Sequence, residues 1–429
     1  MTRSNHSQFI WNLFGSLSTA LVSVVLLWIV SRTLPLDEAD MFSFAYSFGN
    51  LMVIVGLFQV RNFQATDLRH EYSFASYLLL RLLTATAMLL LSLAYVFFGG
   101  LSGTKAQVVI LVICFRLADV LSDVFQGFYQ QHNRLDKAGK YLTVRNGLSL
   151  LIFGLMLSFS KGLSLSLAGV SLLSLAYVYC YDWRKSFTIS PWAMAELWQK
   201  ETLLQAKSIL LATFPLFLNG FILLYIYNNP KYVLDNLLEA GVIPSGLQTY
   251  FNVLFMPAFV MNLVMLFFRP QLTKMADFFT SRDMLGFHRL QYQILLYLGL
   301  FSALVLIGSW ILGIPALELV YGLSLSPYKR AFLWLMAGGV LGSFATAFDN
   351  FLTILRQQRF LLVSYLGSLL MSLIITKPLV QARVLEGAAL SYFITMLVWL
   401  LLSVLTYSYL NHRMKEVYDV DSLKDKRNN

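Results

Sequence analysis

The sequence is poor in the residue types that soluble enzymes use for chemistry. Of its 429 residues only 13% are charged, and it contains 2 cysteines, 10 prolines and 5 histidines. Cys114 and Cys180 both lie in apolar segments, which excludes a disulfide framework and a thiolate metal site. The histidines show no spacing typical of metal ligands. We therefore predict no metal site and no cofactor.

Catalytic signatures are missing as well. The chain contains no nucleotide-binding glycine loop, nucleophile elbow, metal-ligand spacing or paired acid–base loop. The sequence therefore gives no indication that the chain hydrolyses a nucleotide. We predict that it is not an enzyme.

Apolar residues make up most of the chain. Hydrophobic residues account for 58% of it, with 34 phenylalanines, and the mean hydropathy is +0.66. This composition is typical of a polytopic membrane protein. The net charge of +10 would suggest a nucleic-acid partner in a soluble domain, but in a membrane protein positive charge gathers in short cytoplasmic loops. We therefore expect membrane lipids, and no nucleic acid, as partners.

Twelve apolar segments have the length of membrane-spanning helices. A helix needs about 20 residues to cross the hydrocarbon core, and the first run is too long for a signal peptide, so it is read as the first span. The segments lie near residues 9–30, 41–60, 77–98, 107–128, 141–160, 163–181, 209–228, 247–268, 292–313, 331–355, 360–376 and 387–410.

These segments predict an all-α polytopic membrane protein with about 12 transmembrane helices in two six-helix halves. A longer polar connection separates the halves. The predicted parts are an N-terminal six-helix lobe (1–182), a cytoplasmic interfacial linker (183–207), a C-terminal six-helix lobe (208–410) and a cytoplasmic tail (411–429).

The distribution of basic residues predicts the orientation. With both termini in the cytoplasm, most lysines and arginines fall in the inner loops, as the positive-inside rule requires. We therefore expect a multi-pass protein of the cytoplasmic membrane with both termini inside. The short matching motifs Asp123-Val-Phe125 and Asp349-Asn-Phe351 fall at equivalent places in the two halves, which indicates a parallel repeat.

Three short motifs stand out in the middle of the chain. They are Asn228-x-Pro230-Lys231-Tyr232, Phe255-Met256-Pro257 and Phe268-Arg269-Pro270-x-Leu272-Thr273. The stretch that contains them resembles the start of the second half of bacterial capsule, O-antigen and exopolysaccharide repeat-unit flippases, which belong to the multidrug/oligosaccharidyl-lipid/polysaccharide exporter superfamily. Asn12 and Gly15 in the first span also match, whereas Asp40 stands where the family often has glycine.

The resemblance implies a V-shaped alternating-access transporter. Its expected function is to move polyprenyl-pyrophosphate-linked oligosaccharide repeat units from the cytoplasmic to the outer leaflet for surface polysaccharide biosynthesis. The expected partners are the lipid-linked oligosaccharide, membrane lipids, and a polymerase with other polysaccharide-assembly proteins.

Charged residues inside the apolar segments are the candidates for function, because charge is costly in hydrocarbon and normally faces a cavity or a partner. Arg116, Asp119 and Asp123 share one face of the fourth span, at positions i, i+3 and i+7. They form either a self-neutralised structural cluster or a cavity-facing one. Arg81 and Arg145 each lie one turn inside a span. They either extend to the cytoplasmic headgroups or hold a lipid pyrophosphate with their planar forks.

The second half has its own candidates. Asp349 lacks a local cation, so it pairs across helices, stays protonated or binds a coupling ion. Lys231 is predicted to lie in an outer loop, residues 229–246, just past the seventh span. The substrate-binding candidates are Arg81, Arg116, Arg145, Asn12, Asn219, Asn228 and Lys231, and the ion-coupling candidates are Asp119, Asp123 and Asp349.

Three rival functions remain open. The nearest is an ion-coupled drug or metabolite exporter of the same superfamily. A membrane polysaccharide polymerase or acyltransferase is disfavoured because the predicted outer loops are short and lack clustered His, Arg or acidic groups. A non-transporting scaffold is disfavoured by the number of charges predicted within the spans.

Overall fold

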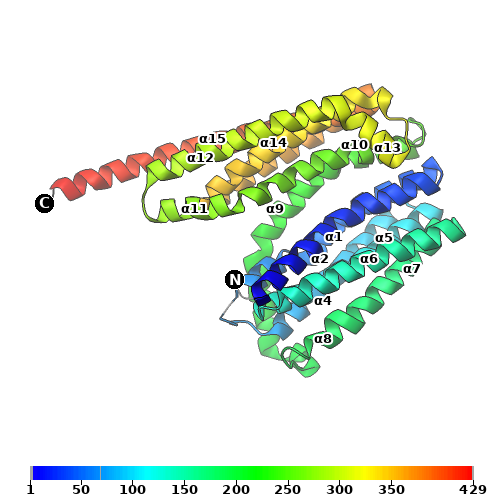
Figure 1. The fold of residues 1–429 in the computed structure, drawn as a ribbon, viewed down its shortest axis with the longest axis horizontal. Helices are drawn as coiled ribbons and strands as arrows, with labels where there is room; N and C mark the ends of the chain where they lie inside the picture. The colour runs from blue at the N-terminus through cyan, green and yellow to red at the C-terminus, as the bar shows by residue number, and fades with distance from the viewer. Residues whose placement is uncertain (1–2, 68, 428–429) are drawn as a thin grey trace. The chain divides into compact units, whose positions relative to one another are not determined.

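The computed structural model describes residues 3–67 and 69–427, which contain helices and connecting turns but no strand (Figure 1). Residues at the ends of the predicted N-terminal lobe and tail (1–2 and 428–429), and residue 68, lie outside it. The chain forms two compact units, Met1–Leu224 and Tyr225–Asn429. The predicted all-α polytopic class is confirmed.

The first unit contains the helices before the middle of α9. They are α1 (Arg3–Thr33), α2 (Leu36–Leu57), α3 (Val60–Thr66), α4 (Phe74–Phe98), α5 (Gly103–Gln131), α6 (Leu135–Ser160), α7 (Leu163–Tyr177), a π-helical turn (Val178–Trp183), α8 (Arg184–Ser186), a 3-10 turn (Met194–Trp198) and the first part of α9 (Lys200–Glu239).

The second unit begins within α9. It continues through α10 (Leu247–Met261), a 3-10 segment (Asn262–Phe268), α11 (Arg269–Thr280), α12 (Met284–Gly308), a π-helical turn (Ser309–Gly313), α13 (Ile314–Tyr321), a 3-10 turn (Ser326–Tyr328), α14 (Lys329–Ile354), a second 3-10 turn (Gln358–Phe360) and α15 (Leu361–Arg427).

Each of the twelve predicted spans has a helical counterpart. Within the described residues, nine helices are long and apolar enough to cross a membrane by length and composition. α5 is not among them because charged residues interrupt it, and α10 is short but continues into Asn262–Phe268. α15 covers two predicted spans, and its backbone leaves the helical region at Val384 (φ 48°). The chain is thus a multi-pass membrane protein.

Glycines allow the helices of each unit to approach closely. A Cβ atom at Gly139 on α6 would clash with the Trp11 carbonyl of α1, and one at Gly15 would lie 3.0 Å from the Gly139 Cα. In the second unit, a Cβ atom at Gly339 on α14 would lie 2.7 Å from the Ala258 carbonyl oxygen of α10. Small residues at these crossings fit membrane helices, whose association depends on tight packing.

One loop prediction is wrong. α9 does not end at Asn228 but continues through Pro230 to Glu239, so the first part of the predicted outer loop 229–246 is helical. The sequence suggested a loop because two asparagines and a proline interrupt the apolar run. Asn229 instead donates from Nδ2 to the Ser372 Oγ and the Thr376 Oγ1 of α15, at 2.9 and 3.1 Å. A polar residue inside a membrane helix is tolerated when a neighbouring helix satisfies it.

Candidate functional site

The first unit contains a buried arginine–aspartate network built around α5. Arg81 of α4 is fully buried, and its Nη2 donates to the Asp123 Oδ2 at 2.6 Å. Its Nη1 donates to the Gly56 carbonyl of α2 at 2.5 Å. Arg61 of α3 lies 3.6 Å from the other oxygen of Asp123. These contacts join α2, α3 and α4 to α5.

Asp119, one turn before Asp123 on α5, accepts from two further arginines. Arg116 donates from Nη1 at 2.5 Å, and Arg145 of α6 donates from Nη2. Arg116 also donates to the Asn50 Oδ1 of α2 at 2.8 Å. Asp119 therefore links α6 and, through Arg116, α2 to the same stretch of α5.

Asp182 is a carboxylate that sequence reasoning missed. It lies in the π-helical turn after α7, is 1% exposed, and accepts from the Ser122 Oγ of α5 at 2.6 Å. Its Oδ1 has no hydrogen-bond partner in the described part of the chain, and it interacts electrostatically with Arg145. It lies one residue past the predicted apolar segment 163–181, so the sequence pattern gave no sign that it is buried.

Two interpretations of this network need correction. Arg145 does not extend to the headgroups but is 4% exposed and paired with Asp119. Arg81 is likewise buried rather than extended. The predicted trio on α5 also divides: Arg116 pairs with Asp119, whereas Asp123 lies one turn further along and pairs with α4. The salt bridges from Arg81 of α4 to Asp123 and from Arg145 of α6 to Asp119 thus connect different helices to the two aspartates.

The second unit contains a buried carboxylate with neutral partners. Asp349 of α14 is 6% exposed and accepts from the Trp399 Nε1 at 3.2 Å and the Ser403 Oγ at 2.8 Å, both on α15. The Tyr365 hydroxyl also hydrogen-bonds to it. Asp349 therefore pairs across helices, and it does so without a cation among the described residues.

Lys231 is buried within α9 instead of standing in a loop. It is 8% exposed, and its Nζ lies 4.5 Å from the centroid of the Phe255 ring of α10. No carboxylate of the described residues forms an ion pair with it. Asn228, three residues earlier, is buried as well.

The remaining candidates do not join these groups. Asn12 is exposed on α1 and Asn219 is half-buried on α9, and neither takes part in the arginine–aspartate network. Three of the residues that the sequence did not single out are polar side chains whose partners lie far away in the chain, namely Asn50, Asp182 and Asn229. A fourth, Gln248, is a buried amide whose side chain has no partner among the described residues.

Known transporter structures share the fold of this chain, whereas no protein-family model and no curated protein matches its sequence. A structure of the lipid II flippase MurJ, in an inward closed conformation, superposes with a TM-score of 0.68 at 11% identity and covers 95% of this chain and 88% of that one. An inward-facing multidrug resistance MATE family transporter of the MOP superfamily gives 0.59 at 13% identity, with 95% of each chain covered. A MOP superfamily transporter from Pyrococcus furiosus gives 0.53 at 12% identity, covering 96% and 95%.

These matches extend over nearly the whole chain, so the fold is that of MOP superfamily transporters. All three matched proteins are transporters rather than enzymes. This agrees with the prediction that the chain is not an enzyme.

The Arg81–Asp123 pair allows a direct test of the network. We expect Arg81→Ala to lower the free energy of unfolding by about 3–5 kcal/mol, because it leaves a carboxylate in a buried site with only a distant partner. The double variant Arg81→Ala/Asp123→Ala should recover part of this loss. The measurement is unfolding of the purified protein in mixed detergent micelles.

Arg184→Ala, which removes an exposed arginine of the same unit, is the matched control and should change stability little. Equal stability of Arg81→Ala and this control would show that the pair does not hold α4 against α5.

Proposed function

We propose that the chain is a flippase for polyprenyl-pyrophosphate-linked oligosaccharide repeat units. It would take the lipid-linked substrate from the cytoplasmic leaflet and release it in the outer leaflet by alternating access, for surface polysaccharide biosynthesis. A polymerase and other polysaccharide-assembly proteins would act on the released product.

The observation that carries this proposal is the full-length match to a lipid II flippase, whose TM-score of 0.68 exceeds the 0.59 of the MATE transporter. The first of these proteins is a lipid II flippase and the second a multidrug resistance transporter. The chain's short motifs, which resemble repeat-unit flippases, favour the lipid. The buried cations suit an anionic headgroup, because a phosphate in a membrane protein must exchange its hydration for fixed donors.

The arginines of the network differ in how accessible they are to an anionic substrate. Arg116 retains 15% of its side-chain surface, whereas Arg81 retains none. Arg116 and Arg145 share Asp119, so an anion that competes with this carboxylate would meet two guanidinium groups. Such forks bind phosphate bidentately. Asn12, Asn219 and Asn228 would supply neutral polar contacts along the path.

A second function, ion-coupled export of a drug or metabolite, is favoured by one observation. Asp349 is a buried carboxylate that holds no cation partner in the described residues, and a group of this kind can bind a coupling ion. Asp119 and Asp123 already hold arginine partners in this structure. Of the three ion-coupling candidates, Asp349 is therefore the one whose substitution best distinguishes an ion-coupled exporter from a flippase.

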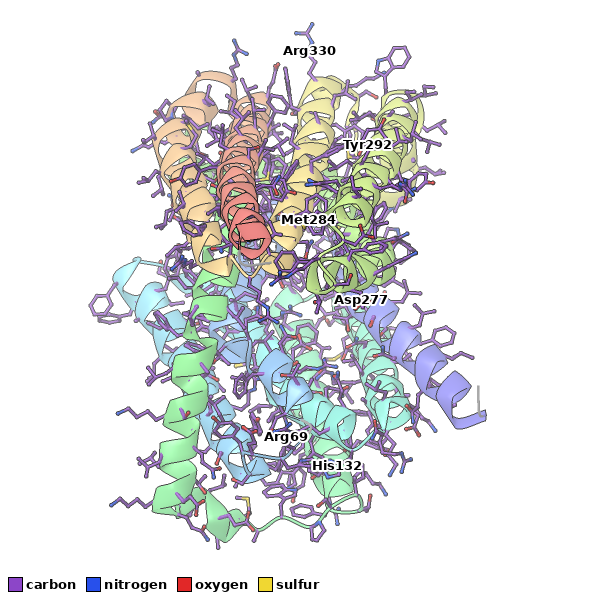
Figure 2. All side chains as sticks on the ribbon, turned by 90° about the vertical axis from the view of Figure 1, so that its left-hand side faces the viewer. Arg69, His132, Asp277, Met284, Tyr292 and Arg330 are labelled. Carbon is purple, nitrogen blue, oxygen red and sulfur yellow. The ribbon has the colours of Figure 1, made fainter. Side chains whose placement is uncertain are left out.

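The proposed orientation places both termini in the cytoplasm. The turn between α11 and α12 and the start of α14 lie at opposite ends of the second unit (Figure 1), as this topology requires. Arg330 at the start of α14 is exposed and extends away from the ribbon (Figure 2), so a hydrated outer surface can accommodate it.

Cysteine labelling in intact cells tests this orientation. On a Cys114→Ser/Cys180→Ser background, an impermeant thiol reagent should label Ser245→Cys, between α9 and α10, and not Thr188→Cys, between α8 and α9. Both positions are exposed, so access depends on the side of the membrane. The reverse labelling pattern would invert the topology.

Transport itself is tested in proteoliposomes. We expect purified protein to move a fluorescent polyprenyl-pyrophosphate-linked sugar between leaflets, measured as the fraction that an impermeant quencher can reach over time. Protein-free vesicles and a neutral glycolipid of equal chain length are the controls. Transport of a cationic drug with no movement of the lipid would favour the exporter instead.

Asp349→Asn tests the second function. The amide can still accept from Trp399 and donate to Ser403, so the variant should fold while losing the charge. If Asp349 binds a coupling ion, an imposed ion gradient should no longer accelerate transport, whereas gradient-free movement should persist. An unchanged gradient effect in this variant would assign Asp349 to holding α14 against α15.

A further inference from the structure

Lys231 is a buried lysine whose ammonium group has no hydrogen-bond acceptor among the described residues. Its ammonium group carries three donors, yet in the described residues it forms no ion pair and lies only against the face of Phe255. Burial of a charge costs several kcal/mol unless a partner compensates it. A cation–π contact contributes about 0.5–2 kcal/mol and compensates only a small part of this cost. The site therefore lacks an acceptor, and an anion would supply it.

A second polar side chain on the neighbouring helix also lacks partners. Gln248 of α10 is 1% exposed, and neither its Oε1 nor its Nε2 has a hydrogen-bond partner in the part of the chain that the structure describes. A buried amide of this kind loses roughly 1–3 kcal/mol for each unmade bond. An amide that offers both a donor and an acceptor is suited to a hydroxyl group, which can accept from one and donate to the other.

Lys231 and Gln248 are related through the geometry of α10. Gln248 and Phe255 are separated by seven residues, so they lie on the same face of α10 about 10 Å apart along its axis. Lys231 of α9 contacts that face at Phe255. A phosphate group bound at Lys231 would thus lie about two helical turns further along α10, near Phe255, than a sugar hydroxyl group bound at Gln248. This separation matches a pyrophosphate followed by a sugar.

The site lies toward one end of α9. This helix has 40 residues, or about 60 Å of length, and exceeds the roughly 30 Å hydrocarbon core. Lys231 lies about two turns before its C-terminal end at Glu239, far from Lys200 at its start. In the proposed orientation, the Glu239 end is the outer one.

We propose that Lys231 and Gln248 form the outer-side headgroup site of the transporter, with Lys231 binding a phosphate group and Gln248 the hydroxyl groups of the attached sugar. This proposal rests on the proposed function. It adds that the anion is held in the second unit by a lysine with no carboxylate competitor, separately from the paired arginines of the first unit.

Ligand binding to the purified full chain tests the site. The probes are inorganic pyrophosphate, geranylgeranyl pyrophosphate, geranylgeranyl monophosphate and a polyprenyl pyrophosphate carrying one sugar. The key variant is Lys231→Met, which removes the charge and keeps an unbranched apolar side chain only one atom shorter than lysine. We expect it to fold, to be at least as stable as wild type without ligand, and to bind both pyrophosphate lipids about tenfold more weakly or worse. The affinity of Lys231→Arg for these lipids should lie between those of wild type and Lys231→Met.

Gln248→Leu separates the two halves of the site. It should leave binding of the sugar-free lipid unchanged and weaken binding of the sugar-bearing lipid about fivefold or more. Lys377→Met and Gln293→Leu, which replace exposed residues of the same unit, are the matched controls and should bind as wild type does. Equal affinity of wild type and Lys231→Met for every probe overturns the proposal, as does a Gln248→Leu variant that binds both lipids normally.

The probes also distinguish the source of the anion. Tight binding of inorganic pyrophosphate with loss in Lys231→Met supports the anion site but assigns it to a free phosphate compound. Binding of the lipids alone assigns it to a lipid headgroup. Wild-type protein that binds the lipid through Lys231 but does not move it would refute the flippase function and keep the site. Full movement by Lys231→Met would refute the site and keep the function.

Discussion

Charge compensation inside the helix bundles is the constraint on which the rest of the structure depends. A charge removed from water costs several kcal/mol unless another group compensates it. In the first unit, Asp119 and Asp123 meet this requirement with arginines from α3, α4, α5 and α6. The same contacts determine which faces of these helices meet α5. In the second unit, neutral donors surround Asp349, whereas Lys231 has only an aromatic ring beside it and stays largely uncompensated.

The sequence predicted the helical class because membrane spans depend on local properties, namely the length and apolarity of each segment. α5 was found although Arg116, Asp119 and Asp123 interrupt it. The prediction failed at Asn228 and Asn229, where polar residues looked like the end of a span. The hydrogen-bond partners of Asn229 are Ser372 and Thr376 of α15, more than a hundred residues later. No local pattern contains that information.

The candidate site could be predicted as a set of charged residues but not as a set of pairs. Any ionisable residue within an apolar run needs a partner, so Arg81 and Asp123 stood out from the sequence alone. Lys231 was a candidate only through the motif in which it lies, because it was predicted to be in a loop. Which partner each one takes depends on how the helices pack. Arg145 resembled a residue that extends to the headgroups because it lies near the helix end, yet α5 offers it Asp119. Uncharged Gln248 gave no signal, since a single glutamine near a span boundary is common.

The two modes of compensation would have different consequences for an anionic substrate. An anion that approaches Arg116 and Arg145 must compete with Asp119, so it gains only the difference between two ion pairs. Displacement of Asp119 would also loosen the attachment of α6 to α5, which couples binding to helix packing. An anion that approaches Lys231 displaces no carboxylate and gains the full interaction, reduced only by its own desolvation. Binding of an anion at Asp119 would thus perturb helix packing in the first unit, whereas binding at Lys231 would leave the ion pairs of the second unit unchanged.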